Sequence, residues 1–167
     1  MSLTLHTSLG DLKIELSLLT PSLSTNFLAL AASGAYDGSC FHRVVHGFIA
    51  QGGAPGLTCK GGESSVGGLL PDEFAPSLRH TGRGTVSFAT STRDSIGSQF
   101  FIAFNACPHL DGQSCVIGSV IGGSVVLDAL ESVKVEGKKF RPSIDVIINN
   151  ITIHSNPFAD KAALLMA

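Results

Sequence analysis

Two short segments of the sequence place hydrogen-bonding side chains among apolar ones. Residues 41–53 read Phe-His-Arg-Val-Val-His-Gly-Phe-Ile-Ala-Gln-Gly-Gly and include a cation, Arg43, and an amide, Gln51. Gln51 follows Arg43 by eight positions, so the two-residue period of a single strand would turn both toward one face. Residues 97–102 again combine an amide, Gln99, with aromatic residues. The pattern fits a site that binds through hydrogen bonds, and equally a structural strand with an arginine along its apolar surface.

Other kinds of chemistry lack their sequence motifs. The sequence contains no nucleophile elbow, no phosphate-binding P-loop and no zinc-binding His-Glu-x-x-His pair. The six histidines are scattered, and the four cysteines form no Cys-x-x-Cys pair. We therefore expect reduced thiols, no metal and no other cofactor.

Composition limits the class of protein further. The chain has 167 residues, of which 44% are hydrophobic and 14% charged, which predicts a single domain over residues 1–167 with a sizeable core. Its net charge of −2 argues against direct nucleic-acid binding. The first residues resemble neither a signal peptide nor a membrane span. We expect an intracellular protein of the cytoplasm, the nucleus or both, neither secreted nor attached to a membrane.

The periodicity of apolar residues predicts about eight strands and two short helices. A hairpin is expected over residues 3–7 and 12–16, followed by a helix that starts at Thr20-Pro21 and stops at Gly34. Residues 52–68 are glycine-rich and predict a long surface loop. Further strands are expected within residues 40–51, 85–89, 99–104, 116–120 and 145–153, and a second helix over residues 123–133. Short strands joined by turns favour a mainly β fold, an antiparallel barrel with helices over its ends.

The same two segments resemble the signatures of the cyclophilins, a family of peptidyl-prolyl cis-trans isomerases. Residues 41–53 are similar to the family pattern Phe-His-Arg-x-x-x-Gly-Phe-x-x-Gln-Gly-Gly, and residues 97–102 to its second signature. The likeness extends over about residues 2–158, leaving a short C-terminal tail. Residues 3–11 and 151–158 resemble the small spliceosome-associated cyclophilins of the cyclophilin-like 3 subgroup. The resemblance implies a closed eight-stranded antiparallel β-barrel capped by two α-helices.

The resemblance also implies an activity and a set of site residues. Cyclophilins catalyse rotation about X–Pro peptide bonds and assist folding or assembly of proline-containing proteins. Arg43 matches the catalytic arginine, and Gln51 matches the amide that holds this arginine and reaches the substrate carbonyl. Phe48, Ile49, Phe101 and Leu110 match the proline pocket, with Phe48 counted among the catalytic residues, and Ala89, Thr90 and Gln99 match the groove for residues before proline.

Four positions depart from the common family pattern. Ile49 replaces a methionine and Thr90 an asparagine, while His109 and Ser114 stand at the pocket rim in place of a tryptophan and a histidine. His109 is smaller and more hydrated than tryptophan, which predicts weakened cyclosporin binding, and Ser114 removes a ring from the wall of the proline pocket. These two replacements also leave open a weakly active or non-catalytic module that binds proline segments within a larger assembly. The expected partners are proline-containing peptide segments, spliceosomal proteins among them, and the chain is expected to be a monomer.

Overall fold

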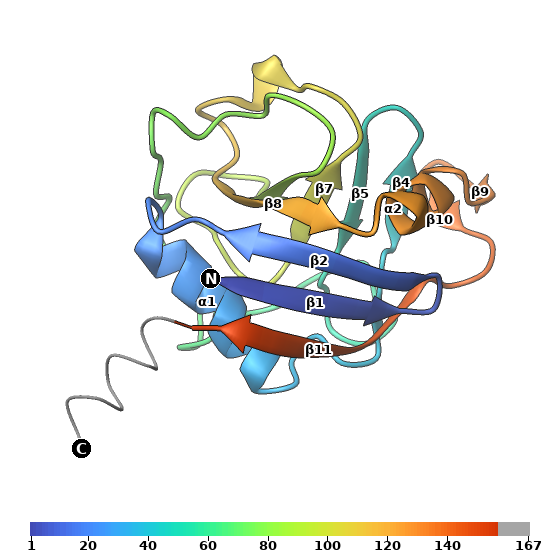
Figure 1. Ribbon diagram of the computed structural model, residues 1–167, viewed down its shortest axis with the longest axis horizontal. Helices are drawn as coiled ribbons and strands as arrows, with labels where there is room; N and C mark the ends of the chain where they lie inside the picture. The colour runs from blue at the N-terminus through green and yellow to red at the C-terminus, as the bar shows by residue number, and fades with distance from the viewer. Residues whose placement is uncertain (157–167) are drawn as a thin grey trace.

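The structure is a computed structural model that describes residues 1–156, and short strands dominate it (Figure 1). The last two residues of the predicted family likeness, 157–158, lie outside the described residues. The expected C-terminal tail lies outside them as well. The strands are β1 (Ser2–Thr7), β2 (Gly10–Leu16), β3 (Ser39–Cys40), β4 (Arg43–Val45), β5 (Ile49–Gly52), β6 (Thr85–Phe88), β7 (Phe100–Ala103), β8 (Val116–Gly122), β9 (Val135–Glu136), β10 (Arg141–Pro142) and β11 (Ile147–Ser155). The helices are α1 (Pro21–Ala32), α2 (Ser124–Glu131) and a 3-10 turn at Pro108–Leu110.

Nine of the strands form one curled antiparallel sheet. Their order is β3-β11-β1-β2-β8-β6-β7-β5-β4, and β9 and β10 pair separately as a small two-stranded sheet. In β2, Leu12, Ile14 and Leu16 are buried while the residues between them are exposed, as expected for a strand with one face in the core. The predicted hairpin over residues 3–16 is confirmed by the β1–β2 pairing.

The expectation of a closed eight-stranded barrel is wrong, because the sheet is open. Its two edges are β3 and β4, which follow one another in the chain but do not pair. The backbone hydrogen bonds that closure would use go elsewhere: Phe41 N–H donates to the Val146 carbonyl at 3.0 Å, and Val44 N–H donates to the Phe140 carbonyl at 2.9 Å. The segment that carries β10 therefore accepts backbone hydrogen bonds from the chain around β4.

The two predicted α-helices are present and lie toward opposite ends of the curled sheet (Figure 1). Helix α1 has proline at its first position and contacts β11 and β8, whereas α2 contacts β2, β4 and β5. Thr20 is the N-cap residue as predicted, although its hydroxyl makes no capping bond. The periodicity did not indicate β9, β10 or the 3-10 turn, which are each only two or three residues long.

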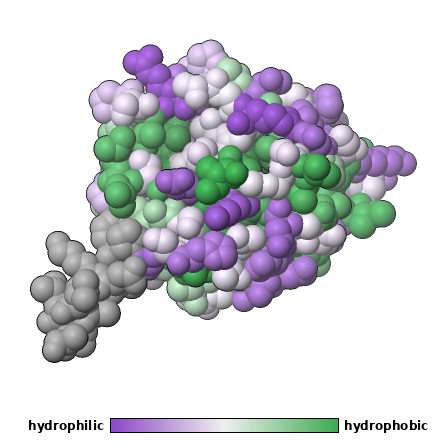
Figure 2. All heavy atoms as spheres, in the orientation of Figure 1, coloured by the Kyte–Doolittle hydropathy of each residue, from purple (hydrophilic) through white to green (hydrophobic). Residues whose placement is uncertain are grey.

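An aromatic cluster fills the concave side of the sheet near α1. Phe27 from α1, Tyr36 and Phe100 from β7 have ring centroids 5.1 to 5.4 Å apart, a favourable spacing for aromatic pairs. The Tyr36 hydroxyl donates to the backbone carbonyl of Ser98 at 2.8 Å. On the outer face shown in Figure 2, hydrophilic and hydrophobic residues are interspersed.

Gly53, directly after β5, lets the chain pass close to this cluster. Its φ is +89°, and a Cβ atom there would lie 2.6 Å from the Ser98 carbonyl oxygen and 3.1 Å from the Tyr36 ring. Only glycine combines this backbone conformation with such a close approach. The second glycine of the Gln-Gly-Gly segment is thus required by packing beneath β5.

We expect Gly53→Ala to destabilise the protein by about 2–5 kcal/mol, the sum of about 1–2 kcal/mol for a left-handed backbone and about 1–3 kcal/mol for overpacking. Gly67→Ala is the matched control, because Gly67 has a φ of +82° but nothing within 4 Å of its Cβ position. Urea unfolding of both variants measures the difference. Equal losses of unfolding free energy in the two variants would show that the close approach at Gly53 adds no cost to the alanine substitution.

Candidate functional site

The β4–β5 hairpin brings Arg43 and Gln51 together on the outer face of the sheet. The two residues are on different strands and are direct cross-strand partners, so the interpretation of one continuous strand is wrong although their shared face is correct. The pairing continues across the sheet, since Gln51 faces Phe101 on β7, and Phe101 faces Ser87 on β6. Cross-strand partners project from the same side of a sheet, so four strands contribute side chains to one row.

The turn between β4 and β5 is fixed from two sides. Gly47, with a φ of +75°, donates its backbone N–H to the Glu131 carboxylate at 3.0 Å, and its carbonyl accepts from the Asn105 amide at 2.9 Å. Glu131 in turn accepts a hydrogen bond from Arg83 at 2.8 Å. The Arg83 hydrogen bond and the Gly47 N–H lower the pKa of Glu131 despite its partial burial, which keeps the carboxylate charged and the turn held.

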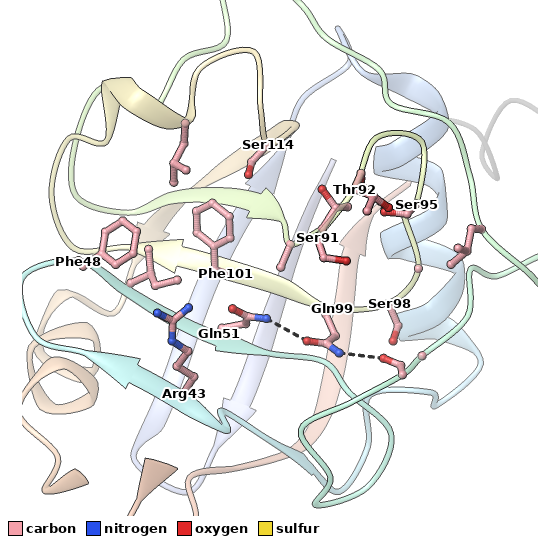
Figure 3. Close-up of a pocket in the computed structure, with 18 residues that line it drawn as sticks. Arg43, Phe48, Gln51, Ser91, Thr92, Ser95, Ser98, Gln99, Phe101 and Ser114 are labelled. Atoms are coloured by element: carbon pink, nitrogen blue, oxygen red, sulfur yellow. Dashed lines mark hydrogen bonds between the residues drawn. The ribbon is translucent and has the colours of Figure 1, made fainter. Parts of the chain in front are cut away.

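A cavity of about 550 Å³ opens beside this row of side chains (Figure 3). Ten of the eleven predicted site residues line it: Arg43, Phe48, Ile49, Gln51, Ala89, Thr90, Gln99, Phe101, Leu110 and Ser114. Gly61 and Gly62 of the predicted glycine-rich loop form another part of the wall. The structure therefore gathers residues from five separate stretches of the chain at one cavity.

The apolar end of the cavity contains Phe48, Ile49, Phe101 and Leu110. Ile49 and Phe101 are only 4% and 3% exposed, so they form a fixed floor. His109 does not line the cavity, and its ring stacks on Phe48 with centroids 5.8 Å apart. His109 is exposed and lies beside a ring of the pocket, so its position at the rim stays a prediction.

The polar side of the cavity contains a chain of amides. Gln51 donates to the Gln99 side-chain oxygen at 2.9 Å, and Gln99 donates to the Gly61 carbonyl at 2.9 Å (Figure 3). The expectation that Gln51 holds Arg43 is not met, because its amide nitrogen bonds Gln99 instead. One N–H and the side-chain oxygen of Gln51 stay available to a ligand.

Arg43 reaches the cavity without a partner of its own. It points toward Phe48 and Phe101 in Figure 3, with Gln51 beside it. Within residues 1–156 its guanidinium takes part in no hydrogen bond and no ion pair. A planar group with five N–H donors is thus presented to whatever occupies the apolar end.

Sequence reasoning missed the hydroxyl groups at the far end of the cavity. Ser91, Thr92 and Ser95 line the wall beyond Thr90 and are labelled in Figure 3. The run of serine and threonine between two strand patterns was the available signal. These hydroxyls extend the polar side of the cavity away from Arg43, as a groove for an extended chain requires.

His80, also missed as a site residue, supports the pocket floor from behind. Its ring stacks on Phe101 with centroids 5.9 Å apart and is almost fully buried. The Nδ1–H and the backbone N–H of His80 both donate to one oxygen of Asp111 at 2.8 Å, and Ser87 contacts Nε2 at 3.2 Å. The two hydrogen bonds from His80 lower the pKa of Asp111, so a charged carboxylate locks the ring behind Phe101.

A fixed apolar pocket, a polar groove and a free guanidinium on a curled β-sheet define a site for an extended peptide with one apolar residue inserted. Comparison of the sequence with known protein families shows which family has this kind of site. Residues 2–153 match the family described as cyclophilin type peptidyl-prolyl cis-trans isomerase/CLD. The chain belongs to this family, and it is an enzyme of the peptidyl-prolyl cis-trans isomerase class, as its sequence signatures predict.

Related proteins can be aligned with almost the whole chain. Proteins named peptidyl-prolyl cis-trans isomerase-like 3 are 50% identical in Gallus gallus and 49% identical in Homo sapiens, each over 95% of this chain and 99% of the relative. A crystal structure of a Cryptosporidium parvum cyclophilin in the presence of the dipeptide Ala-Pro superimposes with a TM-score of 0.88 and 41% identity. It covers 93% of this chain and 100% of that one.

In the described part of the chain, no three His, Cys, Asp or Glu side chains come together as a metal site would require. Among the same residues, none of the helices has the length and apolar character needed to cross a membrane. All four cysteines are free thiols.

We expect Asp111→Asn to flatten the acid dependence of stability. The lowered pKa means that ionised Asp111 stabilises the folded state above about pH 4, and that this contribution is lost as the pH falls through the lowered value. Asparagine keeps an acceptor oxygen but does not titrate. Urea midpoints between about pH 7 and pH 3 should therefore fall less in the variant than in the wild type.

Glu15→Gln is the control, since the exposed Glu15 carboxylate has no hydrogen bond or ion pair within residues 1–156. The urea midpoint of this control variant should fall with pH as it does in the wild type. If Asp111→Asn does so as well, the carboxylate does not hold His80 in the way the structure indicates.

Proposed function

We propose that the protein catalyses cis-trans isomerisation of X–Pro bonds in protein segments, with the Arg43 guanidinium as the group that favours the twisted amide. The observation that carries this proposal is an unpaired guanidinium at the edge of a buried apolar pocket. When amide resonance is broken, the prolyl nitrogen gains a lone pair that can accept a hydrogen bond. A donor to that lone pair binds the transition state and not the planar ground state.

The energies require more than this one hydrogen bond. The barrier to rotation is about 18–20 kcal/mol, and a gain of about 10⁵-fold corresponds to about 7 kcal/mol. A charge-assisted hydrogen bond contributes about 1.5–3 kcal/mol. The remainder must come from holding the proline and the flanking chain in position, which suits the fixed floor made by Ile49 and Phe101.

The other cavity residues are assigned by their position. Phe48, Ile49, Phe101 and Leu110 would hold the proline ring in the apolar end. Gln51 would bind the substrate backbone with the N–H and oxygen that Gln99 leaves free. Ala89, Thr90 and Gln99 would bind the residues before proline, and the hydroxyls beyond Thr90 continue this groove. No step in this scheme uses a metal or another cofactor.

The cellular role we propose is assistance to folding or assembly inside the cell by a monomeric enzyme, with spliceosomal proteins among the clients. Its support is the likeness of residues 3–11 and 151–158 to the spliceosome-associated subgroup. A non-catalytic role as a proline-segment binder is the second candidate. Ser114 favours it, because a small hydroxyl stands in the cavity wall where most of the family has a ring.

Arg43→Ala should lower kcat/KM for an X–Pro peptide by about 10- to 150-fold, the equivalent of about 1.5–3 kcal/mol. Peptide affinity should change much less, because the hydrogen bond forms mainly in the twisted state. Arg43→Lys keeps the charge but lacks the planar donor group, so it should also lose most of the contribution of Arg43 to kcat/KM. Isomerisation assays in the presence of EDTA and an NMR titration measure the two quantities.

Arg79→Ala is the matched control, as Arg79 is exposed and outside the cavity. Its turnover should equal that of the wild type. Near-wild-type turnover of Arg43→Ala would contradict the proposed mechanism. Wild-type protein that binds the peptide without accelerating its isomerisation would favour the binding module instead.

His109→Trp should tighten cyclosporin binding by about 10- to 70-fold. In the cyclophilins a tryptophan at this position covers part of the drug, and restoring about 60–100 Å² of apolar burial contributes about 1.5–2.5 kcal/mol. Peptide turnover should change little, because His109 does not line the cavity. Calorimetry on both proteins is the measurement, and equal drug affinity would show that residue 109 lies outside the drug-binding surface.

A further inference from the structure

A second cavity, of about 400 Å³, lies on the other side of Arg43 and Gln51. Its lining residues are His42, Arg43, Gln51, Cys59, Lys60, Lys138, Lys139 and Arg141. Arg43 and Gln51 also line the first cavity, so the two cavities share a wall. We call the second one the cationic cavity.

The concentration of positive charge there is unusual for this chain. The whole sequence contains 11 lysines and arginines and has a net charge of −2, yet five of these cations line this one cavity. Among its described lining residues there is no aspartate or glutamate. Like charges that converge raise each other's energy, and an anion placed among them lowers this cost.

Most of these cations have no partner of their own. Arg141 is paired with Asp145 at 3.1 Å and also donates to the Leu57 carbonyl. The side chains of Lys60, Lys138 and Lys139, which are exposed, make no hydrogen bond or ion pair within residues 1–156. Together with Arg43, four of the five cations are free to bind a ligand.

A buried histidine, His42, lies in the same wall and is affected by the positive charges around it. His42 is 6% exposed, and its Nδ1 is a buried polar atom without a hydrogen-bond partner in the structure. Burial and the charges of Arg141 and Arg43 lower the pKa of His42 to about 4, so the ring is neutral near pH 7. The ring therefore adds no positive charge of its own to this wall, whose cations are the lysines and arginines.

We propose that the cationic cavity binds an anionic side chain, a carboxylate or a phosphoryl group, located near the proline of the substrate segment. This inference rests on the proposed function: since the two cavities share Arg43 and Gln51, a residue that flanks a proline held in the first cavity would be within reach of the second. The first cavity would recognise the proline, and the cationic cavity would select among proline segments by charge. Lysine ammonium groups suit either anion as point charges, and arginine can bind both in a bidentate manner.

The test uses short Ala-Pro peptides in which one glutamate or phosphoserine is moved through the positions before and after the proline, with glutamine and serine as neutral counterparts. At one or two adjacent positions the anion should lower Kd by about two- to thirtyfold, the range expected for two exposed ion pairs. Inorganic phosphate and added salt should reduce this gain and leave the neutral peptides unaffected. The glutamate and phosphoserine series separate the two sources of the anion.

The double variant Lys138→Gln/Lys139→Gln should abolish the gain and leave turnover of the neutral peptide unchanged. Lys13→Gln/Lys134→Gln removes the same net charge from exposed lysines outside both cavities and should retain the gain. Equal affinity for anionic and neutral peptides, or a gain at every position that survives the first double variant, would overturn the inference. Absence of isomerisation of the neutral peptide would instead contradict the proposed function.

Discussion

The antiparallel register between β4 and β5 determines where the chemistry of this protein can occur. It sets Arg43 opposite Gln51, and the next pairing sets Gln51 opposite Phe101. A shift of one residue would turn the cation into the core and expose the apolar residues of the strand. The register is held at Gly47 by the Glu131 carboxylate and the Asn105 amide. The β4–β5 hairpin is therefore anchored to α2 and to the loop after β7, so the face that carries Arg43 and Gln51 is already arranged before any ligand binds.

The arginines of this protein differ in whether they have a carboxylate partner. Arg83 has two carboxylate partners, Asp128 and Glu131, and Arg141 is paired with Asp145. Arg43 has none within the described residues. A paired guanidinium stabilises structure but has its donors occupied, whereas an unpaired one beside an apolar pocket can give its full interaction to a group that appears only in the transition state. Within residues 1–156, the lack of an ion pair distinguishes Arg43 from these two structural arginines.

Local patterns predicted the local structure well and the long-range structure poorly. The alternation in residues 3–16 and the Thr20-Pro21 start were sufficient for the first hairpin and for α1. The open sheet was not predictable in this way, because β3 and β4 are neighbours in sequence yet lie at opposite edges. His80 was missed for the same reason: its contact with Phe101 joins residues whose proximity only the folded chain creates. Ten of the predicted site residues meet at the first cavity, because family signatures carry long-range information that periodicity does not.

The two cavities also differ in what a sequence can reveal. The first follows from two compact segments, whereas the cationic cavity assembles residue 42, residues 59–60 and residues 138–141 from three distant stretches. Its connection to catalysis is the shared wall at Arg43. A guanidinium has five donors in a planar fork, so it can contact an anion on one side and keep donors directed at the proline pocket on the other. An anion in the cationic cavity could be bound by Lys60, Lys138 and Lys139, so that recognition of a charged flanking residue need not occupy the donors that Arg43 directs at the proline pocket.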